Sequence, residues 1–491
     1  MLLGLDIGTS SVKAALLDAG GRTAAEASAA CPVDAPRPGW AEAPTEKWWQ
    51  AIVDATHRLP VSLRAQVQGI GLSGQMHGVV LADAGGTALR PAILWLDNRS
   101  ADCLSRYPAD SELRIGNPIS AGMAGPTLLW LAAHENETLR AARWALQPKD
   151  WVRLRLTGVA ATEPSDASGT LLTDHHGHWD DTLIAELGLP RALLPVILES
   201  AQVSGGLTTA AARALGLTHG IPVAGGAGDT LAAAFGSGLY VDGAAQLSIG
   251  SSAQIMVMQA KWSGYSPRLN NYRSANPGDL PRWCLMAAML NAGVALEWAR
   301  HILRLTWNEV YDLAFTAQAT QSRTVFLPYV TGERTPWMNP NVRGAWVGLS
   351  PSDDSGSLMR AALLGVAFAI RAGLDALREH GLRIERLRLV GGGSVHAAWR
   401  RMLIDVLGVP LDAVTCANTA ARGAAVLGGL AAGVWTTADL PALAPAAVAA
   451  GEPSGDDLAE GYARFRDLYT RLAGWFDPGT PAQPRVRGTD R

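Results

Sequence analysis

The segment Asp6-Ile7-Gly8-Thr9-Ser10 combines residue types that can bind a metal ion and phosphate. A carboxylate and two hydroxyls supply the hard oxygen atoms that Mg²⁺ prefers, and a glycine lets backbone amides approach an anion closely. The same residues would also suit an ordinary hairpin turn beside a solvated aspartate. The segment is suited to a phosphate site, but on its own it favours the ordinary turn.

A second glycine-rich segment, Gly391-Gly392-Gly393-Ser394, follows a strand-like run and precedes a helical one that contains Trp399 and Val406. A glycine turn between a strand and a helix lets a nucleotide approach and presents free amides at the helix N-terminus. A tight connection without any ligand is the alternative.

Asp229 stands at the end of the segment from Pro222 to Thr230, after a probable strand and a run of glycines. Seen alone, Asp229 is favoured as the N-cap of the helix that begins near Leu231, which is a common role of aspartate. A chemical role would require its carboxylate to point into a cleft.

Met76 and His77 lie in a fourth segment, Gly74 to Gly78, which follows the strand-like residues 70–72. A histidine can recognise a hydroxyl group, but a single histidine is more often a satisfied structural residue. Methionine often fills gaps in a core. The local pattern does not decide between these alternatives.

A hairpin must position the first of these segments, and a similar hairpin recurs half a chain later. Leu3, Leu5 and Ile7 alternate with small or polar residues, a turn follows at residues 8–10, and a second strand runs through residues 12–16. The run Leu247 to Ser252 repeats the pattern half a chain later and precedes a β-like run at residues 255–258. The repeat predicts two lobes of similar topology.

Further elements complete an α/β arrangement. Residues 67–72 and 387–390 are predicted to be strands, and Pro44-Thr45 is predicted to start a helix. Glycine-rich stretches before the second hairpin place the domain boundary near residue 243. Residues 458–475 have helical periodicity, and the prolines after them predict a disordered tail at 479–491.

Composition excludes several classes of function. The chain has 491 residues, of which 48% are apolar and 17% charged, with a net charge of −3, as expected of a packed protein with more than one domain. No basic block points to nucleic acid, and no uncharged apolar run reaches the roughly 18 residues of a membrane helix. Four scattered cysteines and the absence of a signal-like N-terminus favour a cytoplasmic location.

Ten segments in register resemble the FGGY family of carbohydrate kinases over nearly the whole chain, most closely its members that phosphorylate D-xylulose. They are LDIGTSSVK from Leu5, GWAEAPTEKWW from Gly39, GLSGQMHG from Gly71, PAILWLDNR from Pro91, QPKDWVRLRLTG from Gln147, SDASGT from Ser165, VAGGAGD from Val223, LSIGSS from Leu247, FLPYVTGERTP from Phe326 and VGGGS from Val390.

The resemblance implies an α/β fold of two actin-like, ribonuclease-H-like lobes with an interdomain catalytic cleft. It implies an N-terminal lobe, residues 1–243, with the sugar, the first phosphate loop and the base, and an ATP-binding C-terminal lobe, residues 244–478. The residues implied to bind MgATP are Asp6, Gly8, Thr9, Ser10, Lys13, Gly250, Ser251, Ser252, Gly392 and Gly393, with Asp6 on the Mg²⁺ through water.

The resemblance also assigns the sugar side of the site. Asp229 is the implied catalytic base, and Met76 and His77 are the implied sugar contacts, since related glycerol kinases have an Arg-Glu pair there. Further substrate candidates are Trp95, Asp97 and Thr230. Three positions depart from the family pattern, namely Thr127, Leu364 and Thr230.

The activity expected from the resemblance is ATP-dependent phosphorylation of D-xylulose to D-xylulose 5-phosphate, with Asp229 accepting a proton at an ordinary carboxylate pKa. Kinases for ribulose, fuculose, gluconate or glycerol remain alternatives, as does a catalytically silent sugar- or nucleotide-binding protein. Small molecules are the expected partners, without nucleic acid or membrane, and a homodimer is possible because dimers are common among similar kinases.

Overall fold

The structure is a computed structural model that describes residues 1–394, 396–455 and 458–476. The chain divides into two compact units. The first contains Met1–Ala244, Val257–Leu285 and Thr415–Ala446, and the second contains Ala245–Met256, Met286–Val414 and Ala447–Arg491. The boundary predicted at residue 243 lies next to the break at 244–245, but one boundary does not describe the two later segments that return to the first unit.

The first unit is built on a mixed sheet with the strand order β11-β12-β5-β1-β2-β3. Strands β1, β2 and β3 are antiparallel neighbours, β1 and β5 are parallel, β5 and β12 are parallel, and β11 is antiparallel to β12. The bounds are β1 Leu2–Ile7, β2 Ser11–Leu17, β3 Thr23–Ala30, β5 Gly69–Gly74, β11 Val203–Gly206 and β12 Pro222–Ala224. The short strand β13 (Ala227–Gly228) pairs with the end of β5.

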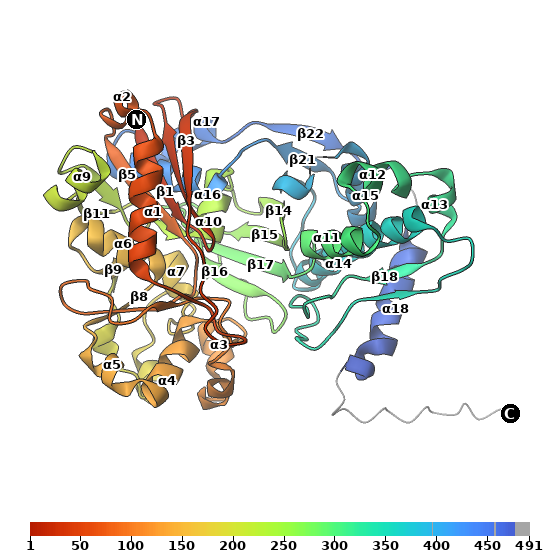
Figure 1. The fold of residues 1–491 in the computed structure, drawn as a ribbon, viewed down its shortest axis with the longest axis horizontal. Coiled ribbons are helices and arrows are strands. Elements are labelled where there is room, and N and C mark those ends of the chain that lie inside the picture. Colours follow the sequence, from red (N-terminus) through yellow and green to blue (C-terminus); the bar gives the residue numbers. More distant parts are fainter. Residues whose placement is uncertain (395, 456–457, 477–491) are drawn as a thin grey trace. The chain divides into compact units, whose positions relative to one another are not determined.

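Helices cover both faces of this sheet, so that β1 is buried throughout. On one face Leu3 and Leu5 share a core with Trp48 of α1 (Thr45–Arg58), which runs along the sheet in Figure 1. On the other face lies α16 (Thr419–Ala431), and a Cβ added to Gly4 would meet the Ala421 carbonyl at 1.8 Å. Glycine is needed at position 4 because it allows this close approach.

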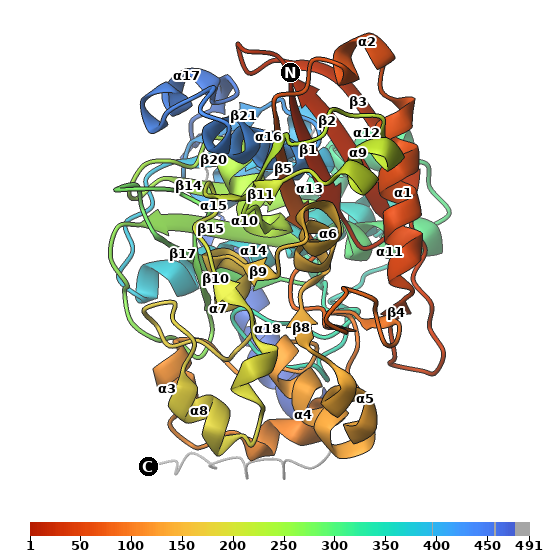
Figure 2. The same ribbon diagram turned by 90° about the vertical axis from the view of Figure 1, so that its left-hand side faces the viewer.

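Four helices of the first unit contribute to a second apolar core and lie together at the bottom of Figure 2, namely α3 Ser111–Ile115, α4 Ala124–His134, α5 Asn136–Ala141 and α8 Asp181–Glu186. The other helices and strands of this unit are α2 Val61–Arg64, α6 Pro148–Thr157, α7 Pro164–Ser168, α9 Thr209–Leu215, α10 Asp229–Gly236, α17 Leu440–Leu443, β4 Glu42–Ala43, β6 Val80–Ala82, β7 Ala92–Ile93, β8 Trp144–Leu146, β9 Ala161–Thr162, β10 Val196–Ile197 and β16 Asn270–Arg273.

The second unit repeats the sheet plan of the first. The seven-stranded sheet that contains β14 has the order β16-β17-β15-β14-β20-β21-β22, in which β14 is parallel to β20, β20 is parallel to β21, and β22 is antiparallel to β21. The bounds are β14 Ala245–Ile249, β15 Ala253–Gln259, β17 Trp283–Met289, β20 Leu387–Val390, β21 Leu411–Val414 and β22 Ala447–Gly451, and the unit boundaries fall within β15 and β17. The prediction of two lobes of similar topology is confirmed.

The helices of the second unit pack around α14 (Ser355–Glu379). Among the residues described, this is the one helix long and apolar enough to cross a membrane, and its most apolar window is 78% buried, as in a core helix. The other elements are α11 Gly293–Ile302, α12 Trp307–Ala314, α13 Ala317–Gln321, α15 Ala397–Leu407, α18 Ala459–Phe476, β18 Val325–Leu327 and β19 Ala345–Val347.

The local predictions largely agree with these bounds. A helix begins at Thr45, a strand occupies 387–390, and a helix spans the predicted run at 458–475. The strand predicted at 67–72 lies two residues later, at Gly69–Gly74. The predicted disordered tail at 479–491 lies outside the described residues.

Candidate functional site

Asp6 is a buried carboxylate whose neighbours are set by the register of the first sheet. Lys13 of β2 and Ser73 of β5 are its partners on the two adjacent strands, and Ser73 Oγ donates a hydrogen bond to Asp6 Oδ1 at 2.9 Å. Burial raises the pKa of Asp6, although Ser73 and Lys13 act in the opposite direction. The alternative of a solvated aspartate is therefore wrong, because only 6% of the residue is exposed.

Asp229 is the first residue of α10, and the N-cap of this helix is Gly228. The alternative that Asp229 is the N-cap is therefore wrong. Its Oδ1 accepts hydrogen bonds from the amide and the hydroxyl of Thr230, at 2.6 and 3.2 Å. Burial, followed by repulsion from Asp6, raises the pKa of Asp229 to about 7, which corrects the ordinary pKa expected from the sequence.

Met76 lies beside the backbone that leads into Asp229, and His77 lies beside Gly169. A Cβ added to Gly228 would meet Met76 Cγ at 2.6 Å, and one added to Gly169 would meet the His77 ring at 3.0 Å and Met76 Cε at 3.2 Å. Both glycines are thus required by close approach. Within the first unit, Met76 therefore contacts both the residue before Asp229 and the glycine that His77 contacts.

His77 is held in an unusual backbone conformation, with φ at 71°. Its amide donates to Gln147 Oε1 at 2.8 Å, and its Nδ1 lies 2.8 Å from the Gly169 carbonyl oxygen. Because a carbonyl can only accept, Nδ1 carries a proton, and this hydrogen bond fixes the orientation of the ring. An imidazole ring held in this way suits recognition of a hydroxyl group.

The turn of the first hairpin lies next to Trp95. Trp95 Nε1 donates to Thr9 Oγ1 at 2.9 Å, and the turn is closed by Gly8 N donating to the Ser11 carbonyl at 3.1 Å. Ser10 is exposed and Lys13 is half-buried. Trp95 therefore contacts the predicted phosphate loop directly.

Asp97 is fully engaged within the protein. Its Oδ1 accepts from the amide and Nε of Arg99, and its Oδ2 accepts from Arg99 Nη2 and from the Ala41 amide, at 2.7 to 2.9 Å. Only 2% of Asp97 is exposed. In this arrangement Asp97 fixes the loop around residue 41, and direct contact with a sugar stays a prediction.

Sequence reasoning missed three residues of this region. Tyr272 of β16 packs against His77 with ring centroids 6.1 Å apart, Ser165 accepts the Gly228 amide, and Gln147 accepts the His77 amide. One sequence signal pointed toward Ser165 and Gln147. Lys149, Asp150 and Arg153 interrupt the apolar run that forms α6, and the structure shows that they are nevertheless buried. Charged residues inside a buried helix indicate paired polar groups.

The second unit brings the other predicted loops together around a cavity of about 830 Å³. Gly250, Ser251, Gly392 and Gly393 line it, because β14 and β20 are parallel neighbours that end side by side. Ser252 closes the hairpin turn by accepting the Gly250 amide at 2.9 Å. A large cavity adjoins both loops, and ligand binding by them stays a prediction.

Aromatic side chains form another wall of this cavity. Trp298, Trp307 and Tyr311 line it, and the ring of Tyr311 stacks on His396 with centroids 3.8 Å apart. The first turn of α11 binds the hairpin, with Gly293 N donating to the Gly250 carbonyl and Val294 N to the Ser251 carbonyl, both at 3.0 Å. Flat apolar surfaces beside turn amides suit a base linked to phosphates.

Two of the departures from the family pattern lie away from these groups. Thr127 is in α4 and Leu364 is in α14, and neither helix carries a candidate site residue. Thr230 differs from them because it donates two hydrogen bonds to Asp229.

Comparisons with known proteins agree with this two-unit arrangement. Residues 1–236 match the N-terminal domain of the FGGY family of carbohydrate kinases, and residues 245–432 match its C-terminal domain. The chain belongs to this family, and it is thus a two-domain carbohydrate kinase that uses ATP.

Individual relatives narrow the comparison. The chain is 37% identical to a xylulose kinase of Escherichia coli K12, covering 88% of this chain and 90% of that protein. The crystal structure of a xyloylose kinase from Brucella ovis is 35% identical, with a TM-score of 0.89 and 96% and 99% coverage. A glycerol kinase of Alkalilimnicola ehrlichii is 32% identical, with 88% and 90% coverage.

Proposed function

We propose that the protein transfers the γ-phosphoryl group of MgATP to a primary hydroxyl of D-xylulose, giving D-xylulose 5-phosphate. Relatives described as xylulose kinases at 37% and 36% identity support this substrate. The observation that carries the proposal is that Met76 lies against Gly228, the residue before Asp229, and also lies with His77 against Gly169 in the same unit. We infer from this arrangement that a proton acceptor and a hydroxyl-recognising group are available to one small ligand.

In the proposed reaction the sugar oxygen forms a bond to the γ-phosphorus while the bond from that phosphorus to the bridging oxygen breaks. ADP leaves with the bonding electrons, and Asp229 accepts the hydroxyl proton. With a pKa of about 7, Asp229 is partly ionised at neutral pH and is a stronger base than an ordinary aspartate. The hydrogen bonds from Thr230 orient its carboxylate.

We propose that the cavity of the second unit binds the nucleotide. Gly392 and Gly393 would contact the adenosine, while the turn at Gly250 and Ser251 would bind phosphate oxygens. An added Cβ on Gly250 or Gly392 would meet no protein atom within 4 Å, so both glycines leave room for a ligand. The stacking surface of Tyr311 and His396 suits the face of a base.

We propose that Mg²⁺ accompanies ATP in the reaction. In the part of the chain that the structure describes, no group of three or more His, Cys, Asp or Glu side chains is arranged to hold a metal. Mg²⁺ commonly uses one or two carboxylates together with waters and substrate phosphates, so the oxygen donors of Asp6 fit a metal that arrives with the nucleotide. Bound there, it would neutralise charge on the phosphates.

A second candidate is phosphorylation of glycerol or another polyol or ketose, and the 32% identity to a glycerol kinase favours it. Met76 and His77 support the ketose instead, because the resemblance gives glycerol kinases an Arg-Glu pair at these positions. A catalytically silent protein is disfavoured by the presence of both Asp6 and Asp229. A cytoplasmic location and a homodimer belong to the same proposal.

The test is a coupled ADP-release assay with a panel of D-xylulose, L-ribulose, L-fuculose, gluconate and glycerol. We expect D-xylulose to give the highest kcat/KM. A preference of tenfold or more for glycerol or L-ribulose would overturn the substrate and leave the kinase activity in place. ADP release without dependence on any of these compounds would overturn both.

A further inference from the structure

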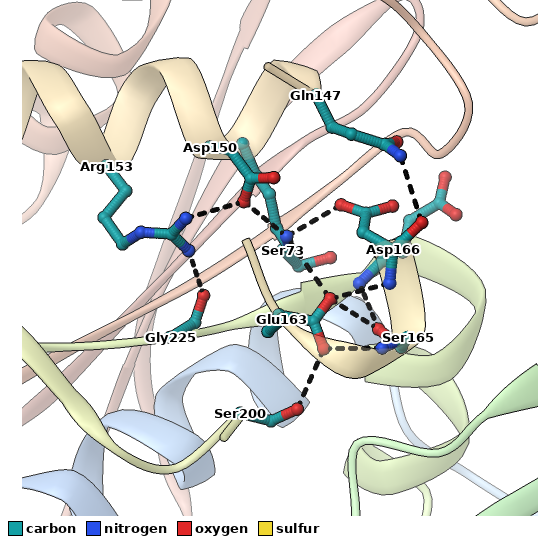
Figure 3. Close-up of polar contacts among 12 residues, drawn as sticks. Ser73, Gln147, Asp150, Arg153, Glu163, Ser165, Asp166, Ser200 and Gly225 are labelled. Carbon is teal, nitrogen blue, oxygen red and sulfur yellow. Dashed lines mark hydrogen bonds and ion pairs between the residues drawn. The ribbon is translucent and has the colours of Figure 1, made fainter. Parts of the chain in front are cut away.

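A set of polar and charged side chains is buried directly behind Met76 and Gly228, where the α6 and α7 helices begin. We name it the α6–α7 frame, and its members are Gln147, Lys149, Asp150, Arg153, Glu163, Ser165 and Asp166, each at most 4% exposed. Figure 3 shows Gln147, just before α6, pointing toward Asp166, and Arg153 of α6 reaching Asp150 and the Gly225 carbonyl. Buried polar groups of this kind are usually paired, and most of the polar atoms of the frame are, although Asp150 Oδ2, Arg153 Nε and Asp166 Oδ1 have no hydrogen-bond partner among the described residues.

Lys149 is the centre of the frame. Its Nζ lies 2.7 Å from Asp150 Oδ1, 2.7 Å from Asp166 Oδ2 and 3.3 Å from Glu163 Oε1. Burial alone would lower the pKa of Lys149, but these carboxylates raise it above its ordinary value. The ammonium group therefore stays charged and joins the start of α6 to the start of α7.

One chain of hydrogen bonds leads from the frame to the residue before the proposed base. Glu163 accepts from Ser165 N and from Ser165 Oγ, at 2.9 and 2.7 Å, which fixes the Ser165 side chain. Ser165 Oγ in turn accepts the amide of Gly228 at 2.9 Å. Because Gly228 is the N-cap of α10, this bond sets where the helix starts and where Asp229 lies.

A second chain leads to the proposed sugar contact. Gln147 Nε2 donates to the carbonyl of Asp166 at 3.0 Å, and Gln147 Oε1 accepts the amide of His77 at 2.8 Å. The amide of a residue with positive φ is thus held by a buried side chain. A left-handed conformation at a histidine needs such support, because it is unfavourable for residues other than glycine.

We propose that Ser165 and Gln147 are separate positioning residues for the phosphoryl transfer. Ser165 holds the backbone of Gly228 and so places Asp229, whereas Gln147 holds the backbone of His77 and so places the sugar contact. Neither residue touches the substrate or the phosphates in this proposal. It rests on the proposed function, in which Asp229 is the base and His77 recognises the sugar.

The proposal predicts that substitutions of Ser165 and Gln147 affect different kinetic constants. Misplacing a base by a fraction of an ångström slows the chemical step, so Ser165→Ala should lower kcat about tenfold or more with little change in the sugar KM. Loosening His77 weakens binding, so Gln147→Leu should raise the sugar KM about tenfold with kcat nearly unchanged.

Ser200 provides a matched control for Ser165. Its hydroxyl also donates to Glu163, at 2.9 Å, and the residue is 3% exposed, but its hydroxyl has no bond to Gly228. Ser200→Ala removes the same type of buried bond to the same carboxylate, and it should leave kcat within about threefold of the wild type. Equal loss of kcat in both serine variants would overturn the role of Ser165.

The decisive measurement combines these variants with changes in the residues that they place. Steady-state kinetics and calorimetric D-xylulose binding are measured in the full-length protein for Ser165→Ala, Asp229→Asn and the double variant, and for Gln147→Leu, His77→Ala and their double variant. We expect Ser165→Ala to have no further effect on kcat in the Asp229→Asn background. Gln147→Leu should likewise add nothing to the KM of His77→Ala.

Additive effects in both double variants would overturn the inference, because independent losses indicate a general structural role. If Asp229→Asn alone left kcat unchanged, the proposed function would have failed in its choice of base, which is a different result. If Ser165→Ala does not fold, Ser165→Cys replaces it, since a thiol preserves the volume and is a poor acceptor for the Gly228 amide.

Discussion

The two glycine-turned hairpins, β1–β2 and β14–β15, occupy the same place in sheets of the same strand order but carry different side chains. Asp6 in the first corresponds to Ser248 in the second, and Gly8-Thr9-Ser10 corresponds to Gly250-Ser251-Ser252. The first hairpin brings a buried carboxylate near Asp229, whereas the second adjoins an aromatic-walled cavity.

The difference shows how one scaffold serves two kinds of recognition. In both hairpins the glycine amide closes the turn, onto Ser11 in the first and Ser252 in the second. In the second hairpin, the start of α11 also binds the turn carbonyls of Gly250 and Ser251. These two turn residues line the cavity. The repeated pattern thus provides the turn. The residue at position 6 or 248 determines whether a buried carboxylate lies beside that turn.

The largest effect is expected in the first unit, at Asp229. Asparagine retains an oxygen that can accept the Thr230 hydrogen bonds but cannot accept a proton, so Asp229→Asn should lower kcat about 100- to 10,000-fold. Sugar binding by calorimetry and the Tm should stay close to wild type. A variant that folds normally and retains more than about a tenth of wild-type kcat would require another base.

Changing the two corresponding hairpin residues tests the comparison itself. Asp6→Ala should lower kcat/KM for MgATP about 10- to 100-fold, as is typical when a group that supports a metal through water is lost, with D-xylulose affinity nearly unchanged. Ser248→Ala should change either value by less than about threefold. Loss of sugar binding with intact nucleotide binding in Asp6→Ala would reverse the placement of the ligands.

Removing the imidazole of His77 should affect the sugar alone. A site built to hydrogen-bond a hydroxyl loses affinity when one partner is missing, so His77→Ala should raise the D-xylulose KM about tenfold. The KM for ATP should remain unchanged. An unaltered sugar KM would make His77 a structural residue, with its contacts to Gly169, Gln147 and Tyr272 as its role.

In the second unit, alanine substitutions can separate ligand contact from folding. A Cβ on Gly250 or Gly392 meets no protein atom within 4 Å, whereas one on Gly393 would meet Ile249 Cγ2 at 2.5 Å. Gly392→Ala should therefore raise the ATP KM several-fold with an unchanged Tm, and Gly393→Ala should lower the Tm. An unaltered ATP KM in both Gly250→Ala and Gly392→Ala would remove these loops from the nucleotide site.

The smallest effect is a pH dependence of stability shared by the two units. Burial raises the pKa of Asp229 in the first unit and of Glu333 in the second to about 7 in each case. A carboxyl with a raised pKa in the folded state contributes stability below about pH 4, and this is lost as the pH rises to about 7.

The measurement is denaturant unfolding of the ligand-free protein between about pH 5 and pH 8. Stability should fall with rising pH, by at most about 1.4 kcal/mol per pH unit for each group. Asp229→Asn and Glu333→Gln should each flatten part of this slope. A slope that neither variant changes would mean that other groups cause it.

The two hairpins and the glycine loops could be predicted from the sequence because their signals are local. Alternation in residues 3–7 and its repeat at 247–249 depend only on neighbours in the chain, and the structure has strands at both places. The environment of Asp6 could not be predicted in this way. Its hydrogen-bond donor Ser73 lies 67 residues later on a neighbouring strand, and α16, whose Ala421 carbonyl lies against Gly4 of the same strand, follows more than four hundred residues later.

The support behind the candidate site was also beyond local patterns. The segments that start at Gln147 and Ser165 contributed to the family resemblance, but the contacts of Ser165 with Gly228 and of Gln147 with His77 join residues far apart in the chain. Tyr272 reaches His77 from a strand that follows the second hairpin. Such pairings depend on the tertiary packing of the first unit.

The late position of α16 has a consequence for how the protein is made. A ribosome that adds ~5–20 residues per second needs on the order of ten to forty seconds between Ala244 and the end of α16 at Ala431. Throughout that time the glycine-lined face of β1 and β5 lacks its covering helix. The first unit therefore cannot complete its core on emergence, and a nascent chain that stops at residue 243 would expose this face to chaperones and to aggregation.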